Sequence, residues 1–324
     1  MIKLQDQRIL VVGGAGFIGS HLVDQLVFEK PKSIHIVDNL FLGKKENLTE
    51  AKSKYSNIFF HQFDATDGSR LRKLIRKECI SMVFNLATKA LEYSFDNPLD
   101  AFNVNILIIG HLLESLRTNE IKNLIHFSSS EAYGTASSVS MSEEHPLKPR
   151  TTYAAGKAAA DILINSYQES FGVQVLIVRP FNNYGPRQNE GLYAGVVPIT
   201  MKRIFDGCSP IIRGNGKQTR DFIYVGDTVS LTLSLAKKEQ LYGRVFNIGT
   251  GKEIRISEII KTICKISSYK GVIKHKPIRS GDVLRHRADI SLLKKSLGDI
   301  SFLTLEKGLA ETWQWYSTKY VDLY

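Results

Sequence analysis

Residues 8–26 read RILVVGGAGFIGSHLVDQL, and this stretch decides the fold. The apolar run at 9–12 predicts a buried strand, and a helical pattern follows from Ser20 to about Phe28. Three glycines stand at the turn between them: Gly13, Gly16 and Gly19. Glycines at such a turn let backbone N–H groups approach a pyrophosphate at the N-terminus of the helix. The stretch therefore predicts a dinucleotide site.

A second apolar run, at 33–37, indicates which dinucleotide binds. It ends at Asp38, about 20 residues beyond the glycines, where a carboxylate can accept both hydroxyls of a ribose. With Asp38 in place, a tight turn without a ligand is the weaker interpretation. Because this carboxylate would repel a 2′-phosphate, the sequence favours NAD as the cofactor, and Lys44 and Lys45 leave NADP as the alternative.

Size, charge and cysteines bound the class of protein. The chain has 324 residues, of which 43% are hydrophobic, as in a globular protein of one large or two moderate domains. It has no uncharged apolar run of about 18 residues and no export signal, so we expect a cytoplasmic protein with no membrane partner. The three cysteines lack metal-ligand spacing, so we expect no metal. The net charge is +11, but no nucleic-acid motif is present, so a polyanionic small substrate or a solvated lysine-rich surface explains the charge better than a nucleic-acid partner.

Strand-like and helical patterns alternate through the first half of the chain. Strands are expected at 34–37, 58–63, 82–86, 123–127 and 173–178, and helices at 67–78, 100–117 and 154–171. The alternation predicts an α/β fold with a Rossmann-type, doubly wound parallel sheet. After Pro180 the chain is rich in glycine, proline and asparagine, which predicts a smaller mixed α/β part that covers the ligand. We therefore expect an NAD-binding domain at 1–180 and a substrate-binding domain at 181–324.

A tyrosine and a lysine stand four residues apart in YAAGK at 153–157, which puts both on one face of a helix. The strand at 123–127 leads into SSSEAYG at 128–134, so hydroxyls and a carboxylate follow a strand end, where the reactive ring of the cofactor should lie. We expect the Lys157 ammonium to stabilise the Tyr153 phenolate and to lower the pKa of this phenol from about 10. Tyr153 could then take the proton of a substrate hydroxyl that Ser129 orients.

Further motifs occur in a fixed order along nearly the whole chain. They are GGAGFIG at 13–19, DN at 38–39, DA at 64–65, LAT at 86–88, SSSEAYG at 128–134, YAAGK at 153–157, RPFNNYGPR at 179–187 and GNGKQTRDFIYVGD at 214–227. This set resembles the extended short-chain dehydrogenase/reductase family, which contains the NAD-dependent nucleotide-sugar epimerases, dehydratases and decarboxylases. Val12 stands where the family usually has threonine, and the segment 85–92 departs from the family pattern after its first residues, which leaves the sugar open.

The resemblance implies a role for individual residues. It implies cofactor contacts from Gly13, Gly16, Phe17, Ile18, Gly19, Asp38, Asn39, Asp64, Ala65, Leu86, Ala87 and Thr88, together with Tyr153 and Lys157. It implies substrate contacts from Ser130, Asn182, Arg187, Arg213, Arg220 and Arg285, which suits a nucleotide-diphosphate sugar because guanidinium groups bind phosphate oxygens in a bidentate way. UDP is the favoured nucleotide, and 181–324 becomes the nucleotide-sugar-binding domain. The helices at 100–117 and 154–171 resemble those that form a four-helix dimer interface in the family, so we expect a homodimer.

Glu131 favours one reaction among those of the family, all of which begin by oxidising a sugar carbon, usually C4. A carboxylate beside the catalytic serine could remove the C5 proton, as elimination of water requires, so a 4,6-dehydratase with catalytic Ser129, Glu131, Tyr153 and Lys157 is the leading hypothesis. Ser130 stands where the strongest dehydratases have an aspartate, and the segment 93–98 resembles 4-epimerases. A 4-epimerase of UDP-hexoses or UDP-hexuronates, a UDP-glucuronate decarboxylase and, in another class, a non-catalytic NAD-binding regulator remain the alternatives.

Overall fold

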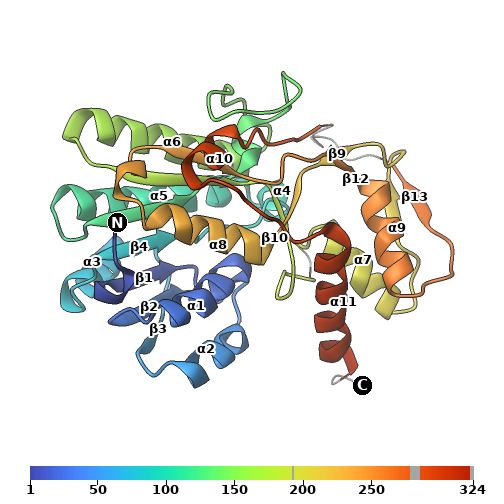
Figure 1. Ribbon diagram of the computed structural model, residues 1–324, viewed down its shortest axis with the longest axis horizontal. Helices are drawn as coiled ribbons and strands as arrows, with labels where there is room; N and C mark the ends of the chain where they lie inside the picture. Colours follow the sequence, from blue (N-terminus) through green and yellow to red (C-terminus); the bar gives the residue numbers. More distant parts are fainter. Residues whose placement is uncertain (192, 278–284, 322–324) are drawn as a thin grey trace.

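The computed structural model describes residues 1–324 except 192, 278–284 and 322–324. Its centre is a seven-stranded sheet in the order β11-β6-β5-β4-β1-β2-β3, with parallel pairing throughout (Figure 1). The strands are β1 (Arg8–Val12), β2 (Ser33–Asp38), β3 (Ile58–Gln62), β4 (Met82–Asn85), β5 (Asn123–Phe127), β6 (Val175–Pro180) and β11 (Val245–Ile248). The strand order reverses between β1 and β4, and open sheets of this kind bind ligands beyond the carboxyl ends of the strands at that point.

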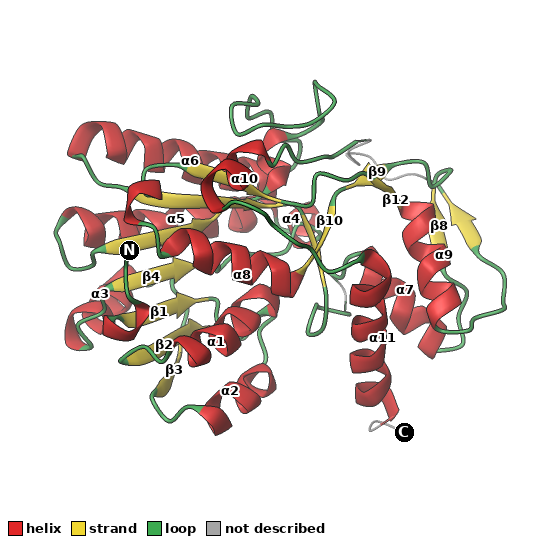
Figure 2. Cartoon of the chain, in the orientation of Figure 1, coloured by secondary structure: helices red, strands yellow, loops and turns green. Residues whose placement is uncertain are grey.

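Helices cover both faces of this sheet (Figures 1 and 2). One face carries α1 (Phe17–Glu29) and α8 (Val225–Ala236), and the other carries α3 (Gly68–Lys77), α5 (Pro98–Arg117) and α6 (Thr152–Phe171). Alternate strand residues supply the two cores, because successive side chains of a strand point to opposite faces. Ile9 and Val11 belong to the core under α1 and α8, whereas Leu10 and Val12 belong to the core under α5. The predicted Rossmann-type α/β fold is confirmed.

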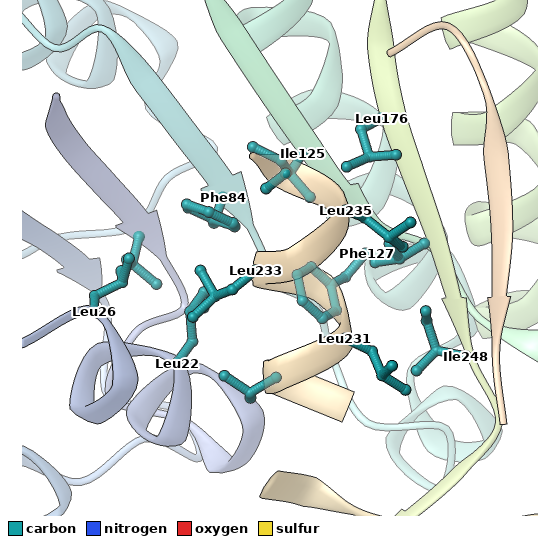
Figure 3. Packing of buried hydrophobic residues seen from close by; sticks show 14 of the residues in the cluster. Leu22, Leu26, Phe84, Ile125, Phe127, Leu176, Leu231, Leu233, Leu235 and Ile248 are labelled. Atoms are coloured by element: carbon teal, nitrogen blue, oxygen red, sulfur yellow. The ribbon is translucent and has the colours of Figure 1, made fainter. Parts of the chain in front are cut away.

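The core under α1 and α8 is formed by long aliphatic and aromatic side chains (Figure 3). Leucines of the two helices face the strand residues, and the labelled set is Leu22, Leu26, Phe84, Ile125, Phe127, Leu176, Leu231, Leu233, Leu235 and Ile248. None of them is more than 8% exposed. Full burial of such a side chain stabilises the fold by about 1.5–3 kcal/mol, so this core fixes α8 on the sheet.

The rest of the chain forms the predicted smaller mixed α/β part. Its helices are α7 (Val196–Phe205), α9 (Ile256–Ile266) and α11 (Leu305–Val321), and they share a core that contains Val197, Met201, Ile259, Ile263 and Leu309. Short strands pair as β7 (Asn182–Tyr184) with β10 (Phe222–Tyr224), β9 (Thr219–Arg220) with β12 (Ile254–Arg255), and β8 (Ile211–Arg213) with β13 (Lys274–Lys276). Three short helices lie against the larger part instead. Helix α2 (Thr49–Lys54) contacts α1, α4 (Tyr93–Asp96) contacts α5, and α10 (Ser291–Leu297) contacts β11.

Most boundaries differ from the expectation by one or two residues, and the following differences bear on the site. Helix α1 begins at Phe17 instead of Ser20, because Gly16 is already its N-cap residue. Strand β6 begins at Val175 instead of 173 and runs to Pro180. The division at residue 180 does not follow the sheet, since β11 and α8 come from beyond it and pack into the first core. The split into 1–180 and 181–324 therefore stays a prediction about binding roles.

Among the described residues, α5 is the one helix whose length and apolar composition would suffice to cross a membrane. Half of its apolar window is buried inside the protein, where α5 packs against α6 and the sheet. A core helix meets the same criteria of length and composition.

Candidate active site

A cavity of about 450 Å³ opens at the carboxyl ends of the central strands, beside the point where the strand order reverses. The residues predicted to bind the cofactor all line it: Gly13, Gly16, Phe17, Ile18, Gly19, Asp38, Asn39, Asp64, Ala65, Leu86, Ala87 and Thr88, with Tyr153 and Lys157. Ser129 and Glu131 line it as well, so the structure brings the four predicted catalytic residues together. Their roles are discussed below from their contacts.

The glycine turn forms the floor of the cavity, and two positions in it have room for no side chain. Gly13 has φ +81°, and a Cβ there would lie 2.8 Å from the backbone nitrogen of Ala87. A Cβ on Gly19 would overlap the carbonyl oxygen of Gly13. Gly16 is the N-cap residue of α1 and lines the cavity, so the N-terminus of this helix faces the cavity. This cradle fits the pyrophosphate of a dinucleotide.

Asp38 ends β2 at the rim of the same cradle and is 8% exposed. Its carboxylate accepts hydrogen bonds from the backbone nitrogens of Ala15 at 3.0 Å and Leu40 at 2.8 Å. Burial nevertheless raises the pKa of Asp38. Next to it, the amide of Asn39 donates to Asp64 at 2.7 Å, which orders the side of the cavity where a ribose and a base would lie.

Tyr153 and Lys157 lie one turn apart at the start of α6, whose first turn is capped by Thr151. The Lys157 side chain is buried, and its Nζ donates to the backbone oxygen of Phe127 at 2.8 Å. Ser129 follows the end of β5, and its Oγ accepts a hydrogen bond from the backbone nitrogen of Glu131. Ser129 also shares a hydrogen bond with Tyr153. The phenol, the ammonium and the serine hydroxyl therefore meet at one end of the cavity.

The pKa of Tyr153 differs from the expectation. Burial raises it to about 12, the negative charge of Glu131 adds to the rise, and the hydrogen bond with Ser129 opposes it. The expected decrease was wrong, because desolvation of the phenol dominates and the Lys157 ammonium is bonded to the backbone oxygen of Phe127. Burial also lowers the pKa of Lys157 to about 8, against the opposing charge of Asp161.

Three of the six predicted substrate residues line the cavity: Ser130, Asn182 and Arg187. The Nδ2 atom of Asn182 is buried and has no hydrogen-bond partner among the described residues, and the same holds for Gln188 Oε1, also on a lining residue. Unpaired buried polar atoms are costly, so these two fit contacts with a polar ligand. The Arg187 guanidinium pairs with Asp24 of α1 at 2.6 Å and thereby ties its loop to the nucleotide side.

The other three arginines lie outside the described lining. Arg213 is on β8, and Arg220 is on β9, where it pairs in register with Ile254. Arg285 binds Glu253 through two hydrogen bonds, the longer at 2.7 Å. Their predicted contacts with a diphosphate stay predictions.

Sequence reasoning missed three buried polar residues next to the site. His286 is fully buried, its Nδ1 lies 3.5 Å from Ser130 Oγ, and burial lowers its pKa to about 3. Asp161 and Arg179 form a buried ion pair at 2.9 Å behind the catalytic residues. Asp161 had a signal, because it follows Tyr153 by eight residues and so lies on the same helix face. Within the described ranges, no group of three or more His, Cys, Asp or Glu residues could hold a metal ion.

The family model described as GDP-mannose 4,6 dehydratase matches residues 10–312. A putative UDP-glucose 4-epimerase of Methanocaldococcus jannaschii is 33% identical over 308 residues, which are 95% of this chain and 97% of the relative. A UDP-N-acetyl-alpha-D-glucosaminuronate decarboxylase of Bacillus cytotoxicus is 31% identical in an alignment of 322 positions that covers 96% of this chain and 98% of the relative. Relatives with different reactions thus match over nearly the full length.

Two solved structures have the same fold over the same length. UDP-glucose 4-epimerase of Thermotoga maritima, determined with UDP-glucose, superposes with a TM-score of 0.90 at 32% identity, covering 96% of this chain and 99% of the other. The dTDP-glucose 4,6-dehydratase of Streptomyces venezuelae, determined with NAD, gives a TM-score of 0.89 at 26% identity, covering 96% and 97%. With the glycine cradle and the Tyr153–Lys157 face in place, the chain belongs to the GDP-mannose 4,6 dehydratase family, within the extended short-chain dehydrogenases/reductases.

Proposed function

We propose that this chain is a 4,6-dehydratase of a nucleotide-diphosphate hexose. It is a nucleotide-sugar-modifying enzyme of its family, and its cofactor is NAD. The observation that carries the finer assignment is the position of Glu131, which lines the cavity and whose charge acts on Tyr153. A carboxylate in that place can accept the C5 proton, the step by which elimination differs from epimerisation.

The residues divide the chemistry among them. Ser129 orients the C4 hydroxyl, the Tyr153 phenolate takes its proton, and the Lys157 charge stabilises the phenolate. NAD, when bound, supplies the acceptor for the hydride that leaves C4. The resulting ketone acidifies the C5 proton, Glu131 accepts that proton, and the C6 hydroxyl departs as water once it gains a proton equivalent to the one that Tyr153 took. Return of the hydride to C6 and of the proton from Glu131 to C5 then completes a net loss of one water. Ser130 precedes Glu131 and also lines the cavity, and we assign it to contact with the leaving hydroxyl.

A 4-epimerase is the second candidate, supported by the relatives of that activity and by the absence of an aspartate at Ser130. An epimerase needs no C5 base, so Glu131 would then only orient its neighbours. A decarboxylase is supported by the relative of that activity that is 31% identical, and it needs a uronate substrate. The intact Tyr153, Lys157 and Ser129 set speaks against a non-catalytic regulator.

The substrate proposal is UDP-linked, since the epimerase structure at 32% identity was determined with UDP-glucose. We also propose a cytoplasmic homodimer, assembled through α5 and α6. These helices lie side by side (Figure 1). They expose apolar side chains, of which Leu107 is 47% and Ile162 59% exposed. Pairing with a second copy would bury them in a four-helix bundle.

A substrate panel tests the reaction. The NAD-loaded protein is incubated with UDP-, dTDP-, GDP- and CDP-hexoses and hexuronates, and products are weighed by mass spectrometry. A mass lower by one water supports the dehydratase, an unchanged mass with inverted C4 supports the epimerase, and a mass lower by one carbon dioxide supports the decarboxylase. No turnover of any member, with NAD bound, would favour the regulator.

A further inference from the structure

Three consecutive residues at the end of β5 contact three residues on one face of α6. The backbone oxygen of Phe127 accepts from Lys157 Nζ at 2.8 Å. The Oγ of Ser128 donates to Asp161 Oδ2 at 2.7 Å. Ser129 is hydrogen-bonded to Tyr153. The helix residues follow one another at steps of four, so the strand end and the helix face are joined in a fixed register.

Asp161 is the one member of this set that does not line the cavity as described, and it is fully buried. Its Oδ2 also accepts from Arg179 Nε on β6 at 2.9 Å. Arg179 in turn donates to the hydroxyl of Tyr133 at 2.9 Å. The carboxylate is therefore held from two neighbouring strands, and one change at Asp161 would loosen α6 from both.

Stability alone does not account for this ion pair. Taking two charges out of water costs several kcal/mol per ion, and well-packed apolar residues in place of a buried pair are often as stable. A buried pair that contacts the strand end next to the catalytic serine is better explained by the geometry it imposes. Its position, one turn beyond Lys157 and two beyond Tyr153, makes those two residues the ones whose placement it controls.

We propose that Asp161 is a positioning residue for the reaction: Ser128 and Arg179 fix its carboxylate, and it fixes the α6 face that presents Tyr153 and Lys157 to the cavity. The proposal rests on the proposed function in that it gives this face a catalytic purpose. It assigns Asp161 no contact with substrate or cofactor.

The charge of Asp161 serves the same end. Lys157 is buried, which disfavours its ammonium form, and Asp161 is the group that opposes this effect. Among the described residues, the titratable groups near Lys157 include Tyr153 on the same helix and His126 on β5, and Arg179 on β6 pairs with Asp161. His126 is held neutral by burial and Arg179 is positive, so neither can replace the negative charge of Asp161.

The test compares Asp161→Asn with the wild type in the NAD-loaded protein. Loss of the carboxylate leaves Arg179 buried without its counter-charge and can impair folding. The double variant Asp161→Asn with Arg179→Gln removes both charges and keeps the experiment informative. Glu120→Gln is the matched control, since it breaks an ion pair with Arg72 and Arg76 just before β5 begins, whereas these contacts lie at the other end of that strand.

If the wild type turns over a nucleotide sugar, the dependence of kcat on pH tests whether Asp161 positions Tyr153 and Lys157. We expect kcat to fall about 10- to 100-fold with KM nearly unchanged, as for other residues that orient catalytic groups. The pH at which Lys157 loses its proton should move to lower values, because the negative charge of Asp161, which raises the pKa of Lys157, is gone. The control variant Glu120→Gln should change neither kcat nor the pH profile. A folded double variant with the wild-type profile and kcat would overturn the proposal, and so would a loss of kcat without any shift of the profile.

With a wild type that turns over no nucleotide sugar, the proposed function fails and amide hydrogen exchange decides instead. The double variant should then exchange faster than wild type over residues 152–160, whereas Glu120→Gln should not. Equal exchange in that segment would overturn the positioning role independently of any activity.

Discussion

Lys157 donates its hydrogen bond to the backbone oxygen of Phe127, at 2.8 Å, and stands one helical turn from Tyr153 in the same cavity. The ammonium is therefore anchored to the end of β5, and in the proposed mechanism its charge stabilises the phenolate. Such an arrangement keeps the charge in place whether or not the phenol is ionised. It also makes the protonation state of Lys157 part of catalysis.

The pH dependence of kcat/KM should reflect both groups. Tyr153 must lose a proton and has a pKa raised to about 12, whereas Lys157 must keep one and has a pKa lowered to about 8. Below about pH 8 the phenolate fraction rises tenfold per pH unit while Lys157 stays charged, so kcat/KM should rise. Above about pH 8 the growing phenolate fraction is offset by loss of the Lys157 charge, so the profile should level off. Lys157→Met should be slower and show no break near pH 8, and a break that persists in this variant would contradict the assignment.

Gly13→Ala should impair NAD binding. The alanine Cβ would lie 2.8 Å from the backbone of Ala87, and its φ of +81° is strained for any residue with a side chain. We expect the dissociation constant for NAD, measured by titration calorimetry, to rise about tenfold or more, which corresponds to about 1.4 kcal/mol. Gly172→Ala is the control, because Gly172 also has a positive φ but has open space around it at the end of α6. Equal NAD affinity in Gly13→Ala and wild type would contradict the assignment of the glycine turn as the pyrophosphate site.

Glu131→Gln should separate oxidation from elimination. The amide cannot accept the C5 proton, so loss of water should stop while slow reduction of the bound cofactor by substrate remains. The two steps are followed by mass spectrometry of the sugar and by absorbance of the reduced cofactor. Unchanged formation of a dehydrated product would reject Glu131 as the base.

Replacing Leu107 and Ile162 by lysine should convert a dimer into a monomer. Both side chains are about half exposed on adjoining helices, and charged residues at the centre of an apolar interface are costly to bury. Light scattering after size exclusion gives the mass, and circular dichroism checks the fold. A wild type that is monomeric at every concentration, or a double variant that stays dimeric, would argue against an interface at α5 and α6.

The sequence predicted what is local and missed what depends on distant contacts. Short-range patterns predicted three features that the structure contains: the glycine turn, the strand at 123–127 and the helix face that carries Tyr153 and Lys157. Strand β11 was not predicted, because a four-residue strand gives little periodicity and its pairing with β6 crosses about 70 residues.

In the candidate site, too, the features that depend on contacts distant in sequence were not predicted. Arg187 was assigned to substrate on its motif, yet its guanidinium contacts Asp24, which is far away in sequence. The rise in the pKa of Tyr153 depends on burial by the folded chain, which no spacing rule contains. The contact between Ser130 and His286 joins residues that are 156 positions apart, and nothing near either one in sequence indicates it.

Single-turnover reduction of bound cofactor tests the central role of Tyr153 most directly. Enzyme loaded with NAD is mixed with the nucleotide sugar that the panel identifies, and the absorbance of reduced cofactor is followed in wild type and in Tyr153→Phe. The account predicts a rate lower by about 10² to 10⁴ in the variant, with NAD affinity unchanged, because the proton acceptor for the C4 hydroxyl is gone. Reduction in Tyr153→Phe as fast as in wild type would contradict it.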